Sequence, residues 1–222
     1  MALSVKICGM KYPDNLQEVA ALSPDYLGFI FYPKSKRYVL EGQEDISLHT
    51  PDILQEMDQL SPGIRKVGVF VNEEIRHIVR IATLTDIRYL QLHGDESPEY
   101  CEQLKMLDFT IIKAFGIDEN FDFTILNEYT DYVDYFLFDT KTPDYGGSGR
   151  RFDWSLLRQY NSQIPVFLSG GLDVEDIATI HDLLNVVPVH ALDFNSKLEI
   201  EPGRKDVAKC REVIEQVRAL PV

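Results

Sequence analysis

The sequence predicts an α/β protein, a (β/α)₈ TIM barrel formed as a single domain by residues 1–222. Eight short apolar runs alternate with eight helix-like stretches, and several runs are continuously apolar. Continuous apolar runs are typical of parallel strands covered on both faces. Eight such repeats in 222 residues suit closure into a barrel, although an open doubly wound sheet is the alternative. No linker or change in composition indicates a second domain.

The expected strands are short and rich in β-branched, aromatic and leucine side chains. They cover Val5–Cys8, Tyr26–Phe31, Lys66–Val71, Tyr89–His93, Thr110–Ala114, Tyr135–Asp139, Val166–Ser169 and Val189–Asp193. The expected helices cover Pro13–Leu22, Glu44–Leu60, Glu73–Leu84, Pro98–Leu107, Phe121–Tyr129, Phe152–Tyr160, Asp173–Leu184 and Lys205–Leu220. Proline in a first turn and aspartate as an N-cap support helix starts at Pro13, Pro98 and Asp173.

The net charge of −14 argues against nucleic acid or an anionic membrane surface as a partner, because both need a basic footprint. A small anionic ligand remains compatible, held by local arginines, backbone N–H groups and helix N-termini. We find no apolar run of the roughly 20 residues that a membrane span needs, and no secretory signal in the first ten residues. We therefore expect a cytoplasmic protein.

The three cysteines are too widely spaced for a disulfide framework or a metal site. Cys210 shares a helical stripe with Val213, Ile214 and Val217, and so is expected to be a buried apolar residue. Cys101 is interpreted in the same way. Cys8 differs because it closes the first strand.

Polar side chains close several of the expected strands: Cys8, His93, Asp139 and Asp193. The second strand leads into a loop with Lys34, Lys36 and Arg37. Each residue alone is commonly structural, as a helix cap, a hydrogen-bonding histidine, an inert thiol or a solvated base. Active sites of this fold lie where strands end and βα loops begin. Because all these polar residues are expected at that one rim of the barrel, together they predict a functional site.

The loops after the seventh and eighth strands predict a phosphate site. Gly170 and Gly171 allow the backbone to approach a phosphate with its N–H groups, and the following helix would add its positive end. These two loops are the usual phosphate site of the fold. The glycine-rich segment GGSGR, residues 146–150, is either an ordered turn or a mobile lid.

Seven segments together resemble the phosphoribosylanthranilate isomerase family: VKICGM, GFIFYPKSKRYV, VGVFVN, LQLHGDE, FDTKTPDYGGSGRRFDW, LSGGL and DFNSKLEIEPGRKD. The resemblance implies a (β/α)₈ barrel without cofactor or metal, a monomer or homodimer. It also implies an Amadori rearrangement in tryptophan biosynthesis. The implied substrate is N-(5-phosphoribosyl)anthranilate, and the product is 1-(2-carboxyphenylamino)-1-deoxyribulose 5-phosphate.

The resemblance also implies roles for individual residues. Cys8 matches the family's general base, Asp139 its general acid, and Arg37 the arginine that pairs with the anthranilate carboxylate. Further substrate-binding positions are His93, Gly170, Gly171, Asp193, Asn195 and Ser196.

This chemistry sets opposite demands on the two catalytic groups. Asp139 must be protonated although a reference aspartate has a pKa of about 3.9, and Cys8 must ionise although a free thiol has a pKa of about 8.5. His93, a backbone N–H or a basic residue of the second loop would help Cys8. Lys6 is expected to point away from the thiol, and Gly9 to leave room for substrate.

Two other functions compete with this one. An isomerase of the histidine-pathway aminoaldose follows the same logic, but its family closes the first strand with aspartate, and its substrate carries two phosphates. A silent barrel that senses a phosphorylated metabolite needs neither Cys8 nor Asp139.

Overall fold

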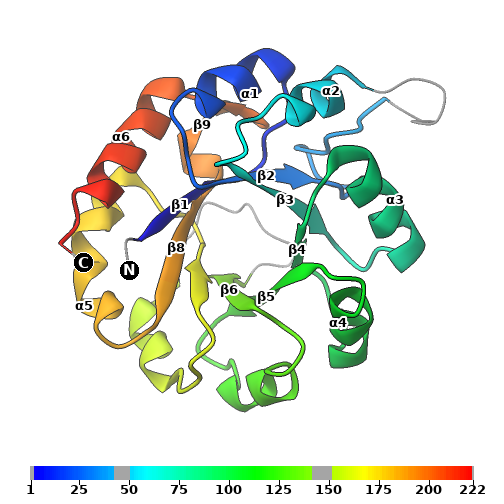
Figure 1. Cartoon of the computed structure of the whole chain (residues 1–222). Coiled ribbons are helices and arrows are strands. Elements are labelled where there is room, and N and C mark those ends of the chain that lie inside the picture. Colours follow the sequence, from blue (N-terminus) through cyan, green and yellow to red (C-terminus); the bar gives the residue numbers. More distant parts are fainter. Residues whose placement is uncertain (1–2, 43–50, 142–151, 222) are drawn as a thin grey trace.

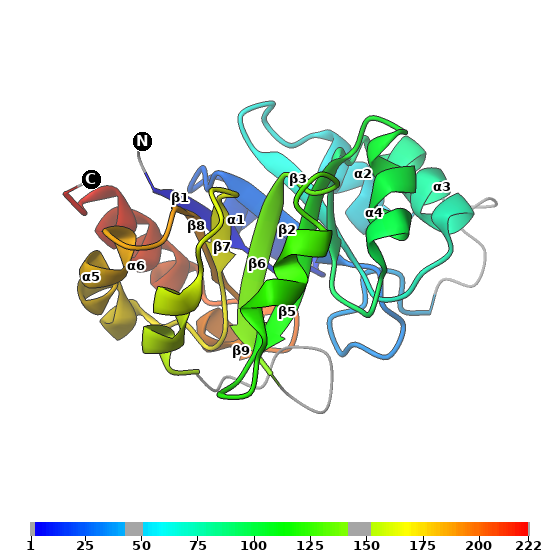
Figure 2. The same cartoon turned by 90° about the horizontal axis from the view of Figure 1, so that it is seen from below.

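A computed structural model describes residues 3–42, 51–141 and 152–221 of the chain. Eight parallel strands form a closed barrel in sequence order, and helices surround it (Figures 1 and 2). The strands are β1 (Ser4–Ile7), β2 (Tyr26–Ile30), β3 (Arg65–Phe70), β4 (Tyr89–Leu92), β5 (Thr110–Ile117), β6 (Tyr135–Thr140), β7 (Val166–Leu168) and β8 (Val189–Phe194). The expected barrel is confirmed, and the open sheet is excluded because β1 pairs with both β2 and β8.

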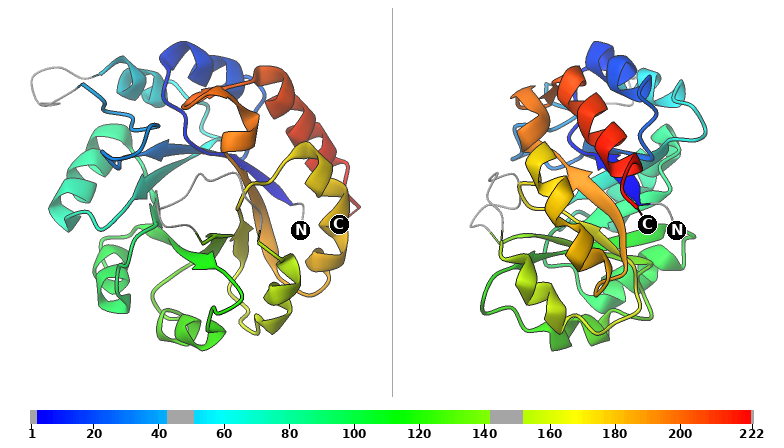
Figure 3. Two further views of the ribbon diagram at one scale, coloured as in Figure 1. Left: turned by 180° about the vertical axis from the view of Figure 1, so that it is seen from behind. Right: turned by 90° about the vertical axis from the view of Figure 1, so that its left-hand side faces the viewer.

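Six α-helices lie outside the barrel among the described residues: α1 (Pro13–Ala20), α2 (Asp52–Asp58), α3 (Ile75–Thr85), α4 (Pro98–Lys105), α5 (His181–Leu184) and α6 (Val207–Arg218). Pro13 and Pro98 occupy first-turn positions as expected. The expected second helix is described only over α2, because residues 43–50 lie outside the described part of the chain. Helix α6 packs against β1 and α1, which brings the two ends of the described chain together (Figure 3).

The segments after β5, β6 and β7 differ from expectation. They form 3₁₀ helices, η1 (Phe123–Glu128), η2 (Trp154–Gln159) and η3 (Val174–Thr179), and η3 is followed by the short α5. Each of the three segments is six residues long and closes with the tighter 3₁₀ turn. Asp173 is the N-cap of η3 and forms a capping box with Asp176.

The two faces of each strand have separate environments. In β1, Val5 and Ile7 pack in the main core beneath the helices, whereas Lys6 hydrogen-bonds to Gln91 and Asp193 inside the barrel. Successive side chains alternate between faces, so Cys8 lies on the same face as Lys6. The expectation that Lys6 points away from Cys8 was wrong, because residues two apart in a strand share a face.

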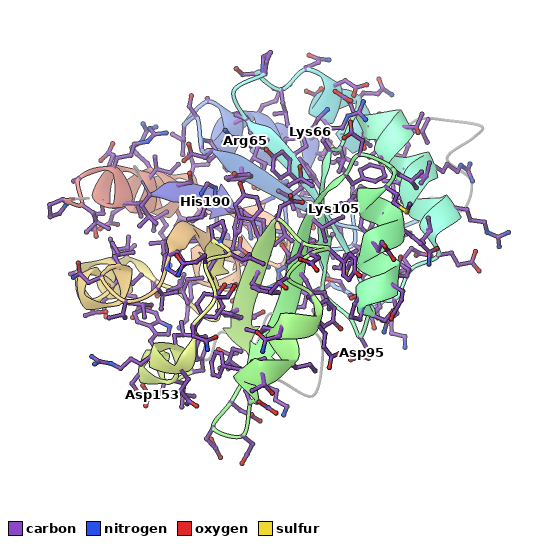
Figure 4. All side chains as sticks on the ribbon, turned by 60° about the horizontal axis from the view of Figure 1, so that its bottom comes forward. Arg65, Lys66, Asp95, Lys105, Asp153 and His190 are labelled. Carbon is purple, nitrogen blue, oxygen red and sulfur yellow. The ribbon has the colours of Figure 1, made fainter. Side chains whose placement is uncertain are left out.

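The end of the barrel at which the strands begin is closed by aromatic side chains. The Tyr26 hydroxyl contacts His190 Nε2 at 2.8 Å, the Arg65 guanidinium lies 5.0 Å from the Tyr26 ring centre, and the Phe167 ring packs edge-on against Tyr26. Figure 4 labels Arg65 and His190, which come from β3 and β8. This layer leaves the opposite end of the barrel for a ligand.

Two cysteines have the structural role expected of them. Cys101 in α4 and Cys210 in α6 are fully buried in the main core, Cys210 beside Val213 and Val217. Burial raises the pKa of each of these two thiols to about 12. Neither thiol is therefore a reactive group at neutral pH.

Candidate active site

The carboxyl ends of the strands surround a cavity of about 690 Å³, a size typical of small-molecule sites. Six expected site residues line it, together with the lysines of the loop after β2. The lining residues include Cys8, Lys34, Lys36, Arg37, Gln91, His93, Asp139, Ser169, Asp193 and Asn195. The sequence-based expectation of a single rim is confirmed for these side chains.

Cys8 immediately follows β1 and is held at the floor of the cavity. Its backbone N–H donates to the carbonyl of Phe194 at 2.8 Å, and its side chain is 4% exposed. A Cβ atom at Gly28 would lie 2.6 Å from Cys8 Sγ, closer than any van der Waals contact allows. The glycine in β2 therefore makes the room that the thiol occupies.

The electrostatic environment of Cys8 contains opposing contributions. Burial raises the pKa of the Cys8 thiol, whereas the ammonium groups of Lys6 and Lys205 favour the thiolate and Asp193 opposes it. Arg37, from the loop after β2, also interacts electrostatically with Cys8. The effect of burial on the pKa is larger than that of the neighbouring charges, so Cys8 is mostly a thiol at neutral pH in the unliganded protein.

We expect alkylation of unliganded Cys8 by iodoacetamide to be slow near pH 7 and to accelerate continuously up to pH 9 or beyond. The thiolate is the reactive species, and a raised pKa moves its formation to higher pH. Mass spectrometry of the peptide that contains Cys8 measures the rate, and Cys101 in the same digest is the internal control. A rate that is independent of pH between about 6 and 8 would contradict the raised pKa.

Lys6 of β1 is completely buried at the floor of the cavity, where it bonds to side chains of β4 and β8. Its Nζ donates to Asp193 Oδ2 at 2.9 Å and to Gln91 Oε1 at 2.7 Å. Burial lowers the pKa of Lys6, but the charge of Asp193 and the interaction with the neighbouring Cys8 outweigh the effect of burial and raise the pKa, so Lys6 remains an ammonium. The other oxygen of Asp193, Oδ1, is buried and accepts no hydrogen bond from the described residues.

Asp139 is the next-to-last residue of strand β6 and is 9% exposed. Its Oδ1 accepts the backbone N–H of Thr140 at 2.7 Å, and its Oδ2 lies 3.5 Å from His93 Nε2. Gly170 has φ +97°, and a Cβ there would lie 2.6 Å from the Thr140 hydroxyl and 3.3 Å from Asp139 Oδ1. Only glycine lets the loop after β7 pass this closely over the carboxyl group.

Arg37 forms a bidentate ion pair that the sequence did not predict. Its Nε and Nη2 each donate to a different oxygen of Glu199 at 2.7 Å, and Lys205 Nζ donates to the same carboxylate at 2.8 Å. Burial raises the pKa of Glu199, but Arg37 and Lys205 outweigh it and hold the pKa below its usual range. The Glu199 carboxylate thus fixes one edge of the guanidinium, while the edge formed by Nη1 and Nη2 makes no further hydrogen bond to the residues that the structure describes.

The space beside Gly9 is taken by protein rather than by an open part of the cavity. Gly9 has φ +79°, and a Cβ there would lie 2.7 Å from Asn195 Oδ1 and 2.8 Å from Arg37 Cδ. The expectation that Gly9 leaves room for substrate is corrected accordingly. Its lack of a side chain lets Arg37 and Asn195 pack together at the rim.

The expected phosphate loops lie at the edge of the cavity. Ser169 and Asn195 line it, whereas Gly170, Gly171 and Ser196 do not. The backbone N–H groups of Gly170 and Gly171 make no hydrogen bond to the described residues. The helix after these glycines was expected to add its positive N-terminal end to the phosphate site. It is η3, and the carboxylates of Asp173 and Asp176 accept hydrogen bonds from backbone N–H groups at its start.

Four residues at the site were not predicted as site residues: Lys6, Gln91 and Lys205, which are buried, and Glu199, whose side chain is 6% exposed. A charged or amide side chain inside an otherwise apolar strand, as in VKIC and YLQLH, is the signal that marks the first two. The segment GGSGR lies outside the described residues. Across the described ranges we find no group of three or more His, Cys, Asp or Glu side chains placed to hold a metal ion. No helix of that same part of the chain is long and apolar enough to cross a membrane.

Residues 5–216 match the family model for N-(5'-phosphoribosyl)anthranilate (PRA) isomerase. The chain belongs to this family. It is similar to the N-(5'-phosphoribosyl)anthranilate isomerase of Parabacteroides distasonis, with 45% identity over 96% of this chain and 92% of the relative. The corresponding protein of Phocaeicola vulgatus is 36% identical over 96% of this chain and 97% of that protein. The resemblance inferred from the sequence is confirmed, and the chain is an isomerase of tryptophan biosynthesis.

Solved structures of the family share the fold. Phosphoribosylanthranilate isomerase from Thermotoga maritima superimposes with a TM-score of 0.82 at 35% identity, covering 98% of this chain and all (100%) of the other. A phosphoribosylanthranilate isomerase in complex with reduced 1-(o-carboxyphenylamino)-1-deoxyribulose 5-phosphate matches with a TM-score of 0.78 at 31% identity, over 98% of this chain and 100% of the other. The closed eight-stranded barrel is thus the fold of the family.

Proposed function

We propose that Cys8 and Asp139 are the general base and general acid with which this isomerase rearranges N-(5-phosphoribosyl)anthranilate. The observation that carries the proposal is that one cavity contains a thiol from the end of β1 and a carboxyl group from the end of β6. Strands β8 and β7 separate β1 from β6 in the barrel, so the two groups face the cavity from different sides, and we place the furanose ring between them.

The reaction begins with proton transfer from Asp139 to the furanose ring oxygen. The bond between C1′ and that oxygen breaks, its electron pair stays on the oxygen, and the nitrogen lone pair forms a cationic Schiff base. Cys8, which has lost its thiol proton to solvent, then removes the proton from C2′ as the thiolate, and the electrons of that bond form the enolamine. Tautomerisation of the enolamine yields the ketone product, and solvent carries a proton from Cys8 back to Asp139.

The charge of the Schiff base supports the role of Cys8. Burial raises the pKa of the unliganded thiol, but a cation formed next to C2′ favours the thiolate at the moment when a base is needed. Lys6 and Lys205 act in the same direction from the protein side. General acid and general base groups of this kind contribute about 10²–10⁴-fold each.

The two ends of the substrate have separate binding groups in this proposal. The phosphate binds to the backbone N–H groups of Gly170 and Gly171 and to Asn195 and Ser196. The anthranilate carboxylate binds to Arg37, which lines the cavity. The unpaired Oδ1 of Asp193 accepts a substrate hydroxyl, which would satisfy a buried acceptor that the protein leaves open.

Replacing Arg37 with alanine is expected to raise KM about 10-fold or more with a smaller effect on kcat, because a charge-assisted hydrogen bond to the carboxylate is lost. Steady-state kinetics measures both constants. Arg204→Ala removes the same charge from a partly exposed arginine that pairs with Asp14 outside the cavity, and it should leave both constants unchanged. Wild-type KM and kcat in Arg37→Ala would exclude the carboxylate contact.

The activity itself is tested by mixing the purified protein with phosphoribosylanthranilate and following the loss of its fluorescence. We expect multiple turnovers, and none in a Cys8→Ser/Asp139→Asn double variant. The aminoaldose of histidine biosynthesis, which carries two phosphates, serves as the competing substrate. Absence of turnover with the first substrate, or faster turnover with the second, would overturn the proposal.

We propose a small phosphorylated metabolite as the only substrate partner, with neither nucleic acid nor membrane bound, and a monomer or homodimer in the cytoplasm. Three free, buried cysteines and the net charge of −14 support this assignment. A dimeric phosphoribosylanthranilate isomerase is known from Thermotoga maritima. Light scattering determines the assembly, and cell fractionation determines the compartment.

A further inference from the structure

Two hydrogen bonds lead from the floor of the cavity to His93, whose ring lies beside Asp139. Lys6 Nζ donates to Gln91 Oε1 at 2.7 Å, and Gln91 Nε2 lies 2.8 Å from His93 Nδ1. The other ring nitrogen, His93 Nε2, lies 3.5 Å from Asp139 Oδ2. These contacts thus connect β1, β4 and β6 through side chains on the inner face of the barrel.

The direction of these hydrogen bonds follows from the chemistry of their first donor. A lysine ammonium has only donors, so the atom of Gln91 facing Lys6 must be the carbonyl oxygen. The amide nitrogen of Gln91 then faces His93 Nδ1, and because an amide nitrogen is only a donor, Nδ1 must accept. A neutral imidazole that accepts at Nδ1 carries its proton on Nε2.

The burial of Lys6 and Gln91 makes it unfavourable to reverse the direction of these hydrogen bonds. Lys6 is 0% exposed and Gln91 is 2% exposed, so water does not compete for their polar atoms. Turning the Gln91 amide would place its N–H groups against the ammonium and its oxygen against Nδ1. A buried donor left without an acceptor destabilises the fold, and the destabilisation is larger next to a charge.

We propose that Lys6 and Gln91 are positioning residues that hold His93 as its Nε2–H tautomer beside Asp139. In the opposite tautomer, a bare Nε2 would accept a proton from the Asp139 carboxyl group and leave a carboxylate. The Nε2–H tautomer cannot accept it, so the proton stays available for the substrate. This consequence rests on the proposed role of Asp139 as general acid, whereas the tautomer itself does not.

The tautomer is measured directly by ¹⁵N NMR of the unliganded protein labelled at histidine, with His93 assigned by its absence in His93→Gln. We expect a pyridine-type Nδ1 and a pyrrole-type Nε2 for His93 in the wild type. In Gln91→Glu, a carboxylate accepts from both Lys6 and the ring, and the proton should appear on Nδ1. Gln103→Glu makes the same change on an exposed face of α4 and should leave His93 as in the wild type.

Kinetics adds a second measurement. We expect Gln91→Glu to lower kcat by about 10-fold or more while KM changes by less than about 3-fold, because acid catalysis rather than binding is impaired. Lys6→Met should remove the preference for one tautomer, although it also leaves the carboxylate of Asp193 buried without its partner.

A pyrrole-type Nδ1 in the wild-type spectrum overturns the proposal, as does a His93 spectrum that is identical in wild type and folded Gln91→Glu. If Gln91→Glu does not fold, the wild-type spectrum alone decides. The NMR measurement involves no substrate and no turnover, so its failure is separate from a failure of the isomerase assay.

Discussion

Cys8→Ser is expected to lower kcat about 10³-fold or more while the protein stays folded. A serine hydroxyl has nearly the same size as the thiol but does not ionise near neutral pH, so the group that removes the C2′ proton is lost. The surroundings remain intact, since the residue packs against Gly28 and its backbone N–H still bonds to Phe194. Progress curves with phosphoribosylanthranilate give kcat, and thermal unfolding checks the fold.

The matched control is Cys101→Ser, the same change at a fully buried cysteine in α4. We expect it to retain wild-type kcat while lowering Tm, because a hydroxyl is placed in the main core without a partner. A kcat in Cys8→Ser within about threefold of wild type would remove Cys8 as the base.

Asp139→Asn is expected to lower kcat by about 10²–10⁴-fold, with a smaller change in KM. The amide cannot deliver a proton to the ring oxygen, but its oxygen still accepts the Thr140 N–H that Asp139 accepts now. The variant therefore separates proton donation from the structural role of the side chain. Single-turnover measurements would place the loss in the ring-opening step.

Asp134→Asn provides the control for this change. Asp134 precedes the same strand at its other end, where it accepts the Ile111 N–H at 2.8 Å and pairs with Lys105. Its replacement should cost stability and leave kcat unchanged. Near-normal turnover in Asp139→Asn, or an equal loss in Asp134→Asn, would exclude Asp139 as the acid.

The strands were predictable because every strand of the barrel needs the same kind of apolar side chains. Each expected strand overlaps an observed one, with ends that differ by up to three residues. Parallel strands between a filled barrel and its helices need apolar side chains on the outer face whatever their position. The helical segments around η1, η2 and η3 were less predictable, because the choice between α and 3₁₀ depends on packing rather than on a local pattern.

The face of β1 on which Lys6 lies follows from the alternation of side chains along a strand. The expectation that Lys6 points away from Cys8 misapplied that alternation. In VKIC, Val5 and Ile7 are the apolar pair that faces the helices, which leaves Lys6 and Cys8 together on the inner face. The partners of Lys6 were not predictable. Gln91 and Asp193 lie 85 and 187 residues away along the chain.

The sequence by itself determined the barrel, the family and the residues that close the strands, because these depend on local patterns of side chains. The tertiary structure decided what each site residue touches: Glu199 on Arg37, Lys6 beside Cys8, and Gln91 between Lys6 and His93. Closure of the barrel brings distant strands together in one register, and charges and hydrogen bonds act over a few ångströms of space. Their strength is therefore set by the fold and not by separation along the chain.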